Sequence, residues 1–279
     1  MIASLLVKEG AIQLTSLSTN PYQESLDLLC FILEATRDQL RLSRSTDEVV
    51  QRDCEVFWSL IERRKKNEPL AYLLNEEVFW DRTFFVDKRV LIPRPETEFL
   101  IEHLFKNHQH FDQILDLCCG SGILGVTCGL HYKNAHITLA DICHDTLEVS
   151  SINTKKHQVK AELIQANLLN SFKENSFDLI VCNPPYVTNR HKEIMTPDVL
   201  SFEPHLALFS ENDGLQHIYL LLDQVQTILK DSGVLYLEVG IDQLNPILSY
   251  IQSKNITHTD TIYDFQNIPR ILVFRRAHE

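Results

Sequence analysis

The chain has 279 residues, of which 44% are hydrophobic and 23% are charged, and its formal net charge is -12. This length predicts one large domain and a smaller one, and the composition excludes a disordered chain because it leaves ample apolar surface to bury. The acidic balance excludes a large surface for nucleic-acid duplexes, since a phosphate backbone repels such a chain unless its cations are gathered into a patch.

The cysteines and the N-terminus indicate the cellular compartment. The seven cysteines include no Cys-x-x-Cys pair, so we expect reduced thiols in a cytoplasmic protein. Residues 1–9 lack the features of a signal peptide, and no apolar run reaches membrane-spanning length. The basic run at residues 63–66 falls where a helix is expected to end, and cations there offset the helix dipole. His108 and His110 are interpreted as loop residues rather than metal ligands.

Residues 1–75 are expected to form a small helical domain. Apolar residues recur at three- and four-residue steps at positions 26, 29, 30 and 33, and again at positions 50, 54, 57, 58 and 61. Ser45 and Glu48 predict a capping box for the second of these helices. No pattern of catalytic residues appears here, so the aromatic residues are interpreted as core. The domain is interpreted as a module that packs on or recognises another molecule or domain.

Residues 76–96 are expected to form a β-hairpin and a proline-rich linker between the domains. Residues 78–86 are rich in aromatic and β-branched side chains around an Asp81-Arg82 turn. Further along, apolar runs alternate with helical stretches, which is typical of a parallel sheet with helices on both faces. We therefore expect an α/β fold with a seven-stranded, mostly parallel, Rossmann-like sheet in residues 97–279. The expected strands are 114–117, 136–141, 161–165, 177–182, 233–239, 257–263 and 271–274.

The first candidate site is the sequence ILDLCCGSGILG at residues 114–125, a strand that ends in an acid and turns through glycines into a helix. Glycine allows close backbone approach, and helix N-terminal N–H groups then face a ligand. Gly120, Gly122 and Gly125 also satisfy the dinucleotide fingerprint, and Asp141 ends the next strand, where it can hold ribose hydroxyls. The turn alone leaves the cofactor open, and a purely structural turn is a further alternative.

The second candidate site is the tetrad Asn183-Pro184-Pro185-Tyr186, which follows the buried run FDLIVC at residues 177–182. Because ligands of open α/β sheets bind at the carboxyl ends of the strands, Asn183 is expected to face the same crevice as the glycine turn. A simple strand-ending turn is the alternative.

The tetrad suits methyl transfer to a planar nitrogen, which is a poor nucleophile. The side-chain oxygen of Asn183 and the carbonyl of Pro184 can each accept one N–H, orient the nitrogen and stabilise the charge that develops on it. Proline adds no competing donor, and Tyr186 can stack on or cover the flat group.

These motifs resemble those of class I S-adenosylmethionine-dependent methyltransferases, and most of all the release factor glutamine N5-methyltransferases (PrmC/HemK family). The resemblance covers nearly the whole chain. It includes the linker LIPRPETE at residues 91–98, the tetrad, and the sequences FEP at 202–204 and EVG at 238–240, with Gln243 and Arg270. DNA adenine methyltransferases share the tetrad without this linker. Cys118 and Asn75 stand where the family usually has glycine, and Asn167 where an acid is common.

The resemblance implies methyl transfer from S-adenosyl-L-methionine, without a metal, to N5 of the glutamine in the Gly-Gly-Gln motif of class I peptide chain release factors. It also implies that the helical domain at residues 1–75 recognises this protein substrate. Stable nucleic-acid binding and a membrane partner are not expected. The implied catalytic residues are Asn183, Pro184, Pro185 and Tyr186. The implied cofactor-binding residues are Asp116, Cys118, Cys119, Gly120, Ser121, Gly122, Asp141, Asn167, Leu168 and Asn183.

Three alternatives remain open at this stage. One is an adenine N6-methyltransferase acting on DNA or RNA, whose target is also a planar conjugated amine. Another is a non-catalytic cofactor-binding partner of the translation apparatus. A dehydrogenase is supported by the glycine turn alone.

Overall fold

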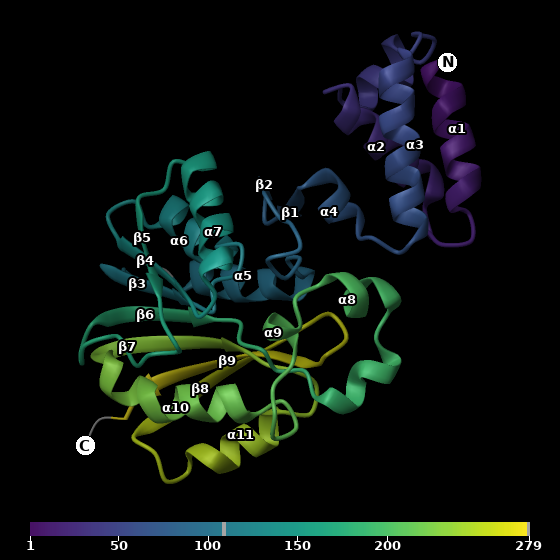
Figure 1. The fold of residues 1–279 in the computed structure, drawn as a ribbon. Helices are drawn as coiled ribbons and strands as arrows, with labels where there is room; N and C mark the ends of the chain where they lie inside the picture. The colour runs from purple at the N-terminus through teal and green to yellow at the C-terminus, as the bar shows by residue number, and fades with distance from the viewer. Residues whose placement is uncertain (108–109, 278–279) are drawn as a thin grey trace. The chain divides into compact units, whose positions relative to one another are not determined.

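The computed structural model describes residues 1–107 and 110–277, and His108 therefore lies outside the described residues. The chain divides into two compact units, each with its own buried hydrophobic residues (Figure 1). The first unit comprises residues 1–76 and 196–202. The second runs from Glu77 to Met195 and resumes at Glu203. Among the described residues, no helix has both the length and the apolar character needed to cross a membrane.

The first unit is helical. Its elements are α1 (Ala3–Leu14), α2 (Pro21–Ile32), the π-helical turn η1 (Gln39–Ser43), α3 (Gln51–Lys65), α4 (Leu70–Leu74) and the short helix α8 (Pro197–Phe202). Leu26, Leu29 and Ile61 from the predicted apolar pattern are buried with Phe57 in one core. Gly10 allows α1 and α3 to pack closely, because a Cβ atom there would lie 2.6 Å from Cζ of Phe57.

The start of α3 differs from the prediction. The expected capping box at Ser45 and Glu48 is wrong, because α3 begins only at Gln51 and no side chain caps it. Glu48 instead pairs with Ile2 in an isolated antiparallel bridge, which keeps the backbone before α3 extended. The basic run at residues 63–66 does lie at the C-terminal end of α3, where cations were expected.

A seven-stranded sheet forms the centre of the second unit. Its strands are β3 (Gln113–Leu117), β4 (His136–Asp141), β5 (Ala161–Gln165), β6 (Phe177–Cys182), β7 (Leu229–Glu238), β8 (Ile256–Tyr263) and β9 (Pro269–Arg276). Their order is β5-β4-β3-β6-β7-β9-β8, and β9 runs antiparallel to both of its neighbours while the other pairs are parallel. The predicted mostly parallel, Rossmann-like α/β sheet is confirmed.

Helices cover both faces of this sheet (Figure 1). On one face lie α5 (Glu98–Lys106), α6 (Ile123–His131) and α7 (His144–Lys156), and on the other α10 (Gln216–Ile228) and α11 (Leu244–Ile251). Successive strand residues point to opposite faces of the sheet. Ile114 of β3 packs in the core on the side of α5, α6 and α7, and Leu115 packs in the core on the side of α10 and α11. Short helical segments η2 (Pro95–Thr97), η3 (Asn189–Ile194) and α9 (His205–Leu208) lie in the connections.

The start of β7 and the position of the hairpin turn differ from the prediction because tertiary packing sets them. β7 begins at Leu229 rather than at residue 233, because Leu229 is buried and pairs with Phe177 before an irregularity in the register. The hairpin strands are β1 (Glu77–Phe79) and β2 (Arg82–Phe84), so the predicted Asp81-Arg82 turn is wrong by one residue. Trp80, with φ of 62°, opens the actual turn, and this register buries Phe79 and Phe84 in ring contact.

Candidate active site

The strand order brings the two sequence motifs to one edge of the sheet. The chain runs from β3 outward to β4 and β5, then returns to β6 on the other side of β3. In the register, Leu117 at the end of β3 pairs with Cys182 of β6 and with Ala140 of β4. The glycine turn, Asp141 and the tetrad therefore follow neighbouring strand ends at the point where the strand order reverses, which is where open α/β sheets bind ligands.

One pocket at this edge contains most of the predicted site residues. It is lined by Asp116, Cys118, Cys119, Gly120, Ser121, Asp141, Asn167, Leu168, Asn183 and Pro185. Gly122, Pro184 and Tyr186 do not line it. Gly122 faces the sheet instead, because a Cβ atom there would lie 2.7 Å from the Leu139 side chain.

The turn between β3 and α6 is left-handed at three positions. The φ angles are 56° at Cys118, 54° at Gly120 and 80° at Gly122. Glycine adopts such angles freely, whereas Cys118 adopts its angle at a cost of about 1–2 kcal/mol. A Cβ atom on Gly120 would meet nothing within 4 Å, so this part of the backbone is open to a ligand. The departure from the family pattern at Cys118 thus falls at a position where glycine is favoured.

Asp116 is a buried carboxylate on the wall of the pocket, with 1% of its surface exposed. One oxygen accepts the Gly125 N–H at 2.7 Å. Burial raises the pKa of Asp116 well above its usual value, and the bond from Gly125 opposes this rise. Burial thus favours the neutral form of Asp116, and a cationic group in the adjoining space would favour its charged form.

Asp141 at the end of β4 is held by the backbone on both sides. Its two oxygens accept N–H groups from Gly120 at 3.1 Å and Cys143 at 3.0 Å. Burial raises the pKa of Asp141, while these backbone bonds lower it. A carboxylate has about four acceptor positions, so Asp141 retains capacity for ligand hydroxyls.

The tetrad is connected to a second buried carboxylate, that of Glu238 at the end of β7. The Asn183 side-chain N–H donates to the Thr97 hydroxyl at 3.4 Å, and this hydroxyl donates to Glu238 at 2.6 Å. The Tyr186 hydroxyl donates to the other Glu238 oxygen at 3.0 Å. Because the amide nitrogen of Asn183 faces Thr97, its oxygen is left to accept an incoming N–H.

Burial dominates the electrostatics of this network. It raises the pKa of Glu238, which is 1% exposed, although the hydroxyls of Thr97 and Tyr186 lower it. It also raises the pKa of Tyr186 well above the usual value, and the neighbouring Glu238 adds to the rise. Tyr186 thus remains a neutral hydrogen-bond donor to Glu238 and is not placed on the pocket wall.

The backbone after the tetrad is fixed by Gln243. Its side-chain N–H donates to the Tyr186 carbonyl at 3.0 Å, while its oxygen accepts the Gly240 N–H at 2.7 Å. Gly214 lies directly against the same carbonyl, since a Cβ atom there would be 2.0 Å from that oxygen. These contacts account for residues that the sequence resemblance singled out without a role.

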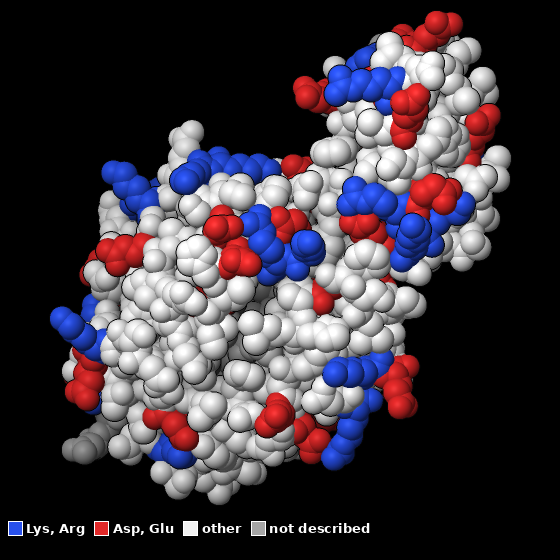
Figure 2. All heavy atoms as spheres, in the orientation of Figure 1, with Lys and Arg blue, Asp and Glu red and all other residues white. Residues whose placement is uncertain are grey.

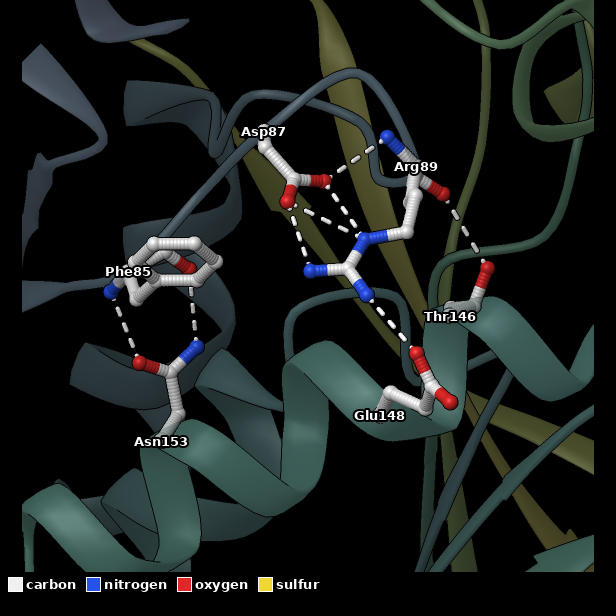
Figure 3. A network of polar contacts seen from close by, with 6 residues as sticks. All are labelled: Phe85, Asp87, Arg89, Thr146, Glu148 and Asn153. Atoms are coloured by element: carbon white, nitrogen blue, oxygen red, sulfur yellow. Dashed lines mark hydrogen bonds and ion pairs between the residues drawn. The ribbon is translucent and has the colours of Figure 1, made fainter.

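The segment after the hairpin forms one rim of the pocket and is fastened to α7. Both backbone groups of Phe85 bond to the Asn153 side chain, at 2.7 and 2.9 Å (Figure 3). The Thr146 hydroxyl donates to the Arg89 carbonyl at 3.1 Å, and Glu148 accepts from the Arg89 guanidinium at 2.8 Å. Arg89 in turn lines the pocket.

The proline-rich linker is fixed in a similar way by Glu203. This residue is 4% exposed and accepts the Ile92 N–H at 3.1 Å and a guanidinium N–H of Arg94 at 2.6 Å. The next residue, Pro204, lines the pocket with Arg94. Glu203 thereby joins two pocket-lining segments that are distant in sequence.

The sequence motifs did not reveal every important residue. Thr97 and Glu238 lie within quoted motifs, but their connection depends on a contact between η2 and β7. His217, Leu206 and Ala207 line the pocket from segments without any distinctive pattern. Among the described residues, no group of three or more His, Cys, Asp or Glu side chains is arranged to hold a metal ion.

Family comparisons match both parts of the chain. Residues 6–74 match the family described as PrmC N-terminal domain, and residues 94–201 match the Methyltransferase small domain. A methyltransferase from Pyrococcus furiosus has a similar structure, with a TM-score of 0.53 and 14% identity, covering 79% of this chain and 98% of that one. At this identity the likeness establishes the fold alone.

Curated relatives cover the chain more closely. It is 41% identical over 223 residues to the release factor glutamine methyltransferase of Leptospira interrogans, covering 76% of this chain and 77% of that protein. It is 32% identical to the release factor glutamine methyltransferase of Clostridium botulinum, covering 99% and 100% respectively. The chain spans about half the length of the bifunctional methyltransferases of Rickettsia that it also matches, such as 53% of the protein from Rickettsia bellii. The full-length match at 32% identity, together with both domain matches, shows that the chain belongs to the release factor glutamine methyltransferase family.

Proposed function

We propose that this chain transfers a methyl group from S-adenosyl-L-methionine to N5 of the glutamine in the Gly-Gly-Gln motif of class I peptide chain release factors. The observation that carries the proposal is the side chain of Asn183. It lies on the same pocket as the glycine turn, and the Thr97 hydroxyl faces its nitrogen, so its oxygen is free for a substrate amide. Membership of the family supports this choice of substrate.

The pocket fits the proposed methyl donor. Asp116 offers a buried carboxyl group whose charged form a cationic methionine end would favour, and the turn offers open backbone at Gly120. Asp141 retains acceptor positions for ribose hydroxyls, while Asn167 and Leu168 are proposed to flank the adenine. When bound, S-adenosyl-L-methionine supplies a methyl group on a sulfonium, which is open to attack by a weak nucleophile.

The tetrad is proposed to orient and polarise the glutamine amide. The Asn183 oxygen, on the pocket wall, accepts one amide N–H, and the carbonyl of the next residue, Pro184, which is not itself on that wall, accepts the other. These two bonds aim the nitrogen lone pair at the methyl group. Both acceptors stabilise the positive charge that grows on nitrogen, and loss of one such partner typically costs 10²–10³ in rate. Thr97 and Glu238 keep Asn183 in its productive orientation. The extra proton leaves late, to water.

Each part of the chain has a proposed role. Residues 1–75 recognise the protein substrate, residues 76–96 link the domains, and residues 97–279 carry out the transfer. The proposed place of action is the cytoplasm, and all seven cysteines are free thiols, which suits a reducing compartment.

An adenine N6-methyltransferase is the second candidate, since the tetrad also suits a planar amine. The charge distribution weighs against it. On the face drawn in Figure 2, Lys and Arg side chains are interspersed with Asp and Glu, and the net charge is -12. The intact tetrad and its hydrogen bonds weigh against a non-catalytic role.

The proposal is tested by transfer of labelled methyl groups. Purified release factor, its Gln-to-Ala variant at the Gly-Gly-Gln motif, DNA and RNA are each incubated with the enzyme and with Asn183→Ala. We expect label on the wild-type factor alone, reduced about 100-fold or more by Asn183→Ala, and calorimetric binding of S-adenosyl-L-methionine to this variant separates loss of the amide acceptor from loss of the cofactor. Label on nucleic acid would establish the adenine enzyme instead, and no label on any substrate would leave the binding role.

A further inference from the structure

A second concave surface of the catalytic unit lies outside the pocket. We call it the aromatic groove. It is formed by the β1–β2 turn, the segment of η2 and α5, and the turn between β8 and β9, and it is lined by the aromatic residues Trp80, Phe99 and Phe265 and the acidic residues Glu96, Glu98 and Glu102, among others. None of these residues takes part in the proposed transfer.

Two aromatic residues of this groove are exposed to solvent. Phe265 has 97% of its surface in contact with solvent, and Trp80 has 38%. The Phe265 ring meets the Phe99 ring edge-on, with 4.9 Å between centroids. Exposed aromatic side chains that gather in a groove mark protein interaction sites, where they act as anchors.

The turn that carries Phe265 is held in one conformation. The Asp264 carboxylate accepts the Gln266 N–H at 2.8 Å, the Ile268 N–H at 3.0 Å and the Arg270 guanidinium at 2.8 Å. A preorganised turn loses little entropy when a partner covers it, so the exposed ring is suited to binding. The backbone of Trp80 is likewise fixed, since its backbone N–H donates to the Glu98 carboxylate at 2.7 Å.

The charges around the aromatic rings select the partner. Four carboxylates line the groove, those of Glu96, Glu98, Glu102 and Asp264. Arg270 pairs with Asp264 and Lys106 pairs with Glu102, so among the described lining residues Glu96 and Glu98 are the carboxylates without an ion pair. The groove therefore favours a segment with Lys or Arg beside an apolar side chain, and it repels nucleic-acid phosphates.

The groove adjoins the tetrad through two elements. In η2, Glu96 faces the groove while the next residue, Thr97, contacts Glu238. On β9, the Arg270 carbonyl accepts the Val239 N–H at 2.8 Å, immediately after Glu238. We propose that the aromatic groove docks a basic segment of the same protein substrate and so guides its glutamine to Asn183. This inference rests on the proposed function.

The test compares Phe265→Ala and the double variant Glu96→Gln/Glu102→Gln with the control Leu220→Ala, which removes an exposed apolar side chain from α10. For intact release factor, we expect Phe265→Ala to raise KM about tenfold, as expected for loss of one buried aromatic anchor. The double variant should weaken the salt dependence of KM. Calorimetric binding of S-adenosyl-L-methionine should be unchanged in all variants, which verifies folding.

The outcomes separate the two proposals. If wild-type enzyme labels no release factor, the proposed function fails, and this inference fails with it. If wild-type enzyme labels the factor but KM of Phe265→Ala matches that of Leu220→Ala, docking in the groove is overturned while the proposed function stands. An unchanged salt dependence in the double variant would likewise overturn the basic character of the docked segment.

Discussion

Cys118 is the residue at which the chain departs most clearly from a glycine-rich turn, because its φ angle is 56°. A side chain branched at Cβ tolerates this angle poorly, so we expect Cys118→Val to destabilise the protein by about 1–3 kcal/mol and to weaken cofactor binding. For Cys118→Gly we expect stability within about 1 kcal/mol of wild type, since relief of strain and the added flexibility of the unfolded chain oppose each other. Urea unfolding and calorimetry measure both; equal stability of Cys118→Val and wild type would contradict the strain.

Glu238 is expected to act on catalysis without touching the substrate, because its oxygens hold the hydroxyls of Thr97 and Tyr186. Glutamine in its place keeps the shape but offers one acceptor instead of two. We expect Glu238→Gln to lower kcat roughly tenfold with little change in KM for S-adenosyl-L-methionine.

A pH profile separates this positioning role from a purely structural one. Burial raises the pKa of Glu238 above its ordinary value of 4.5. As the pH falls through the raised value, the carboxylate gains a proton and loses one acceptor, so wild-type kcat should decline there. Glu238→Gln should lack this acid limb, and the same limb in both proteins would show that another group causes it.

At the scale of elements, Asn153 joins α7 to the rim of the pocket. Its side chain bonds to both backbone groups of Phe85 (Figure 3). It also donates to the Ser121 carbonyl and is fully buried. Asn153→Ala leaves these groups unpaired, so we expect a loss of about 2–4 kcal/mol in the free energy of unfolding. Urea denaturation measures it, with Asn170→Ala at an exposed position as control; a loss below about 1 kcal/mol would show that Asn153 does not hold the rim.

The sequence predicted most elements of the sheet because its strands are short, apolar and bounded by turns. The limits of β4, β5 and β6 agree with the residue ranges expected. The predictions of the hairpin turn and of the helix cap are wrong because pairing between strands sets both structures. The register that buries Phe84 fixes the hairpin turn, and Glu48 forms a bridge instead of taking part in a cap. The β3 turn lines one pocket with Asn183 and Pro185 of the tetrad because parallel strands end at a common edge. The link from Asn183 through Thr97 lies between distant segments, so no local pattern predicts it.

At the scale of the whole molecule, each compact unit contains one of the two tryptophans, Trp58 in the first and Trp80 in the second. The proposed cofactor pocket belongs entirely to the second unit. A ligand that binds only the folded state at 100 times its Kd adds about 2.7 kcal/mol to stability, which corresponds to a rise in Tm of roughly 5–10 °C for a unit of this size.

Fluorescence can therefore follow the second unit alone in Trp58→Phe, where Trp80 is the remaining reporter. We expect S-adenosyl-L-methionine to raise the melting midpoint of this variant by roughly 5–10 °C. In the matched variant Trp80→Phe, the reporter Trp58 should shift less, because the pocket is not in its unit. An unchanged midpoint for Trp58→Phe at saturating ligand would refute the cofactor pocket, since binding to the folded state alone must stabilise it.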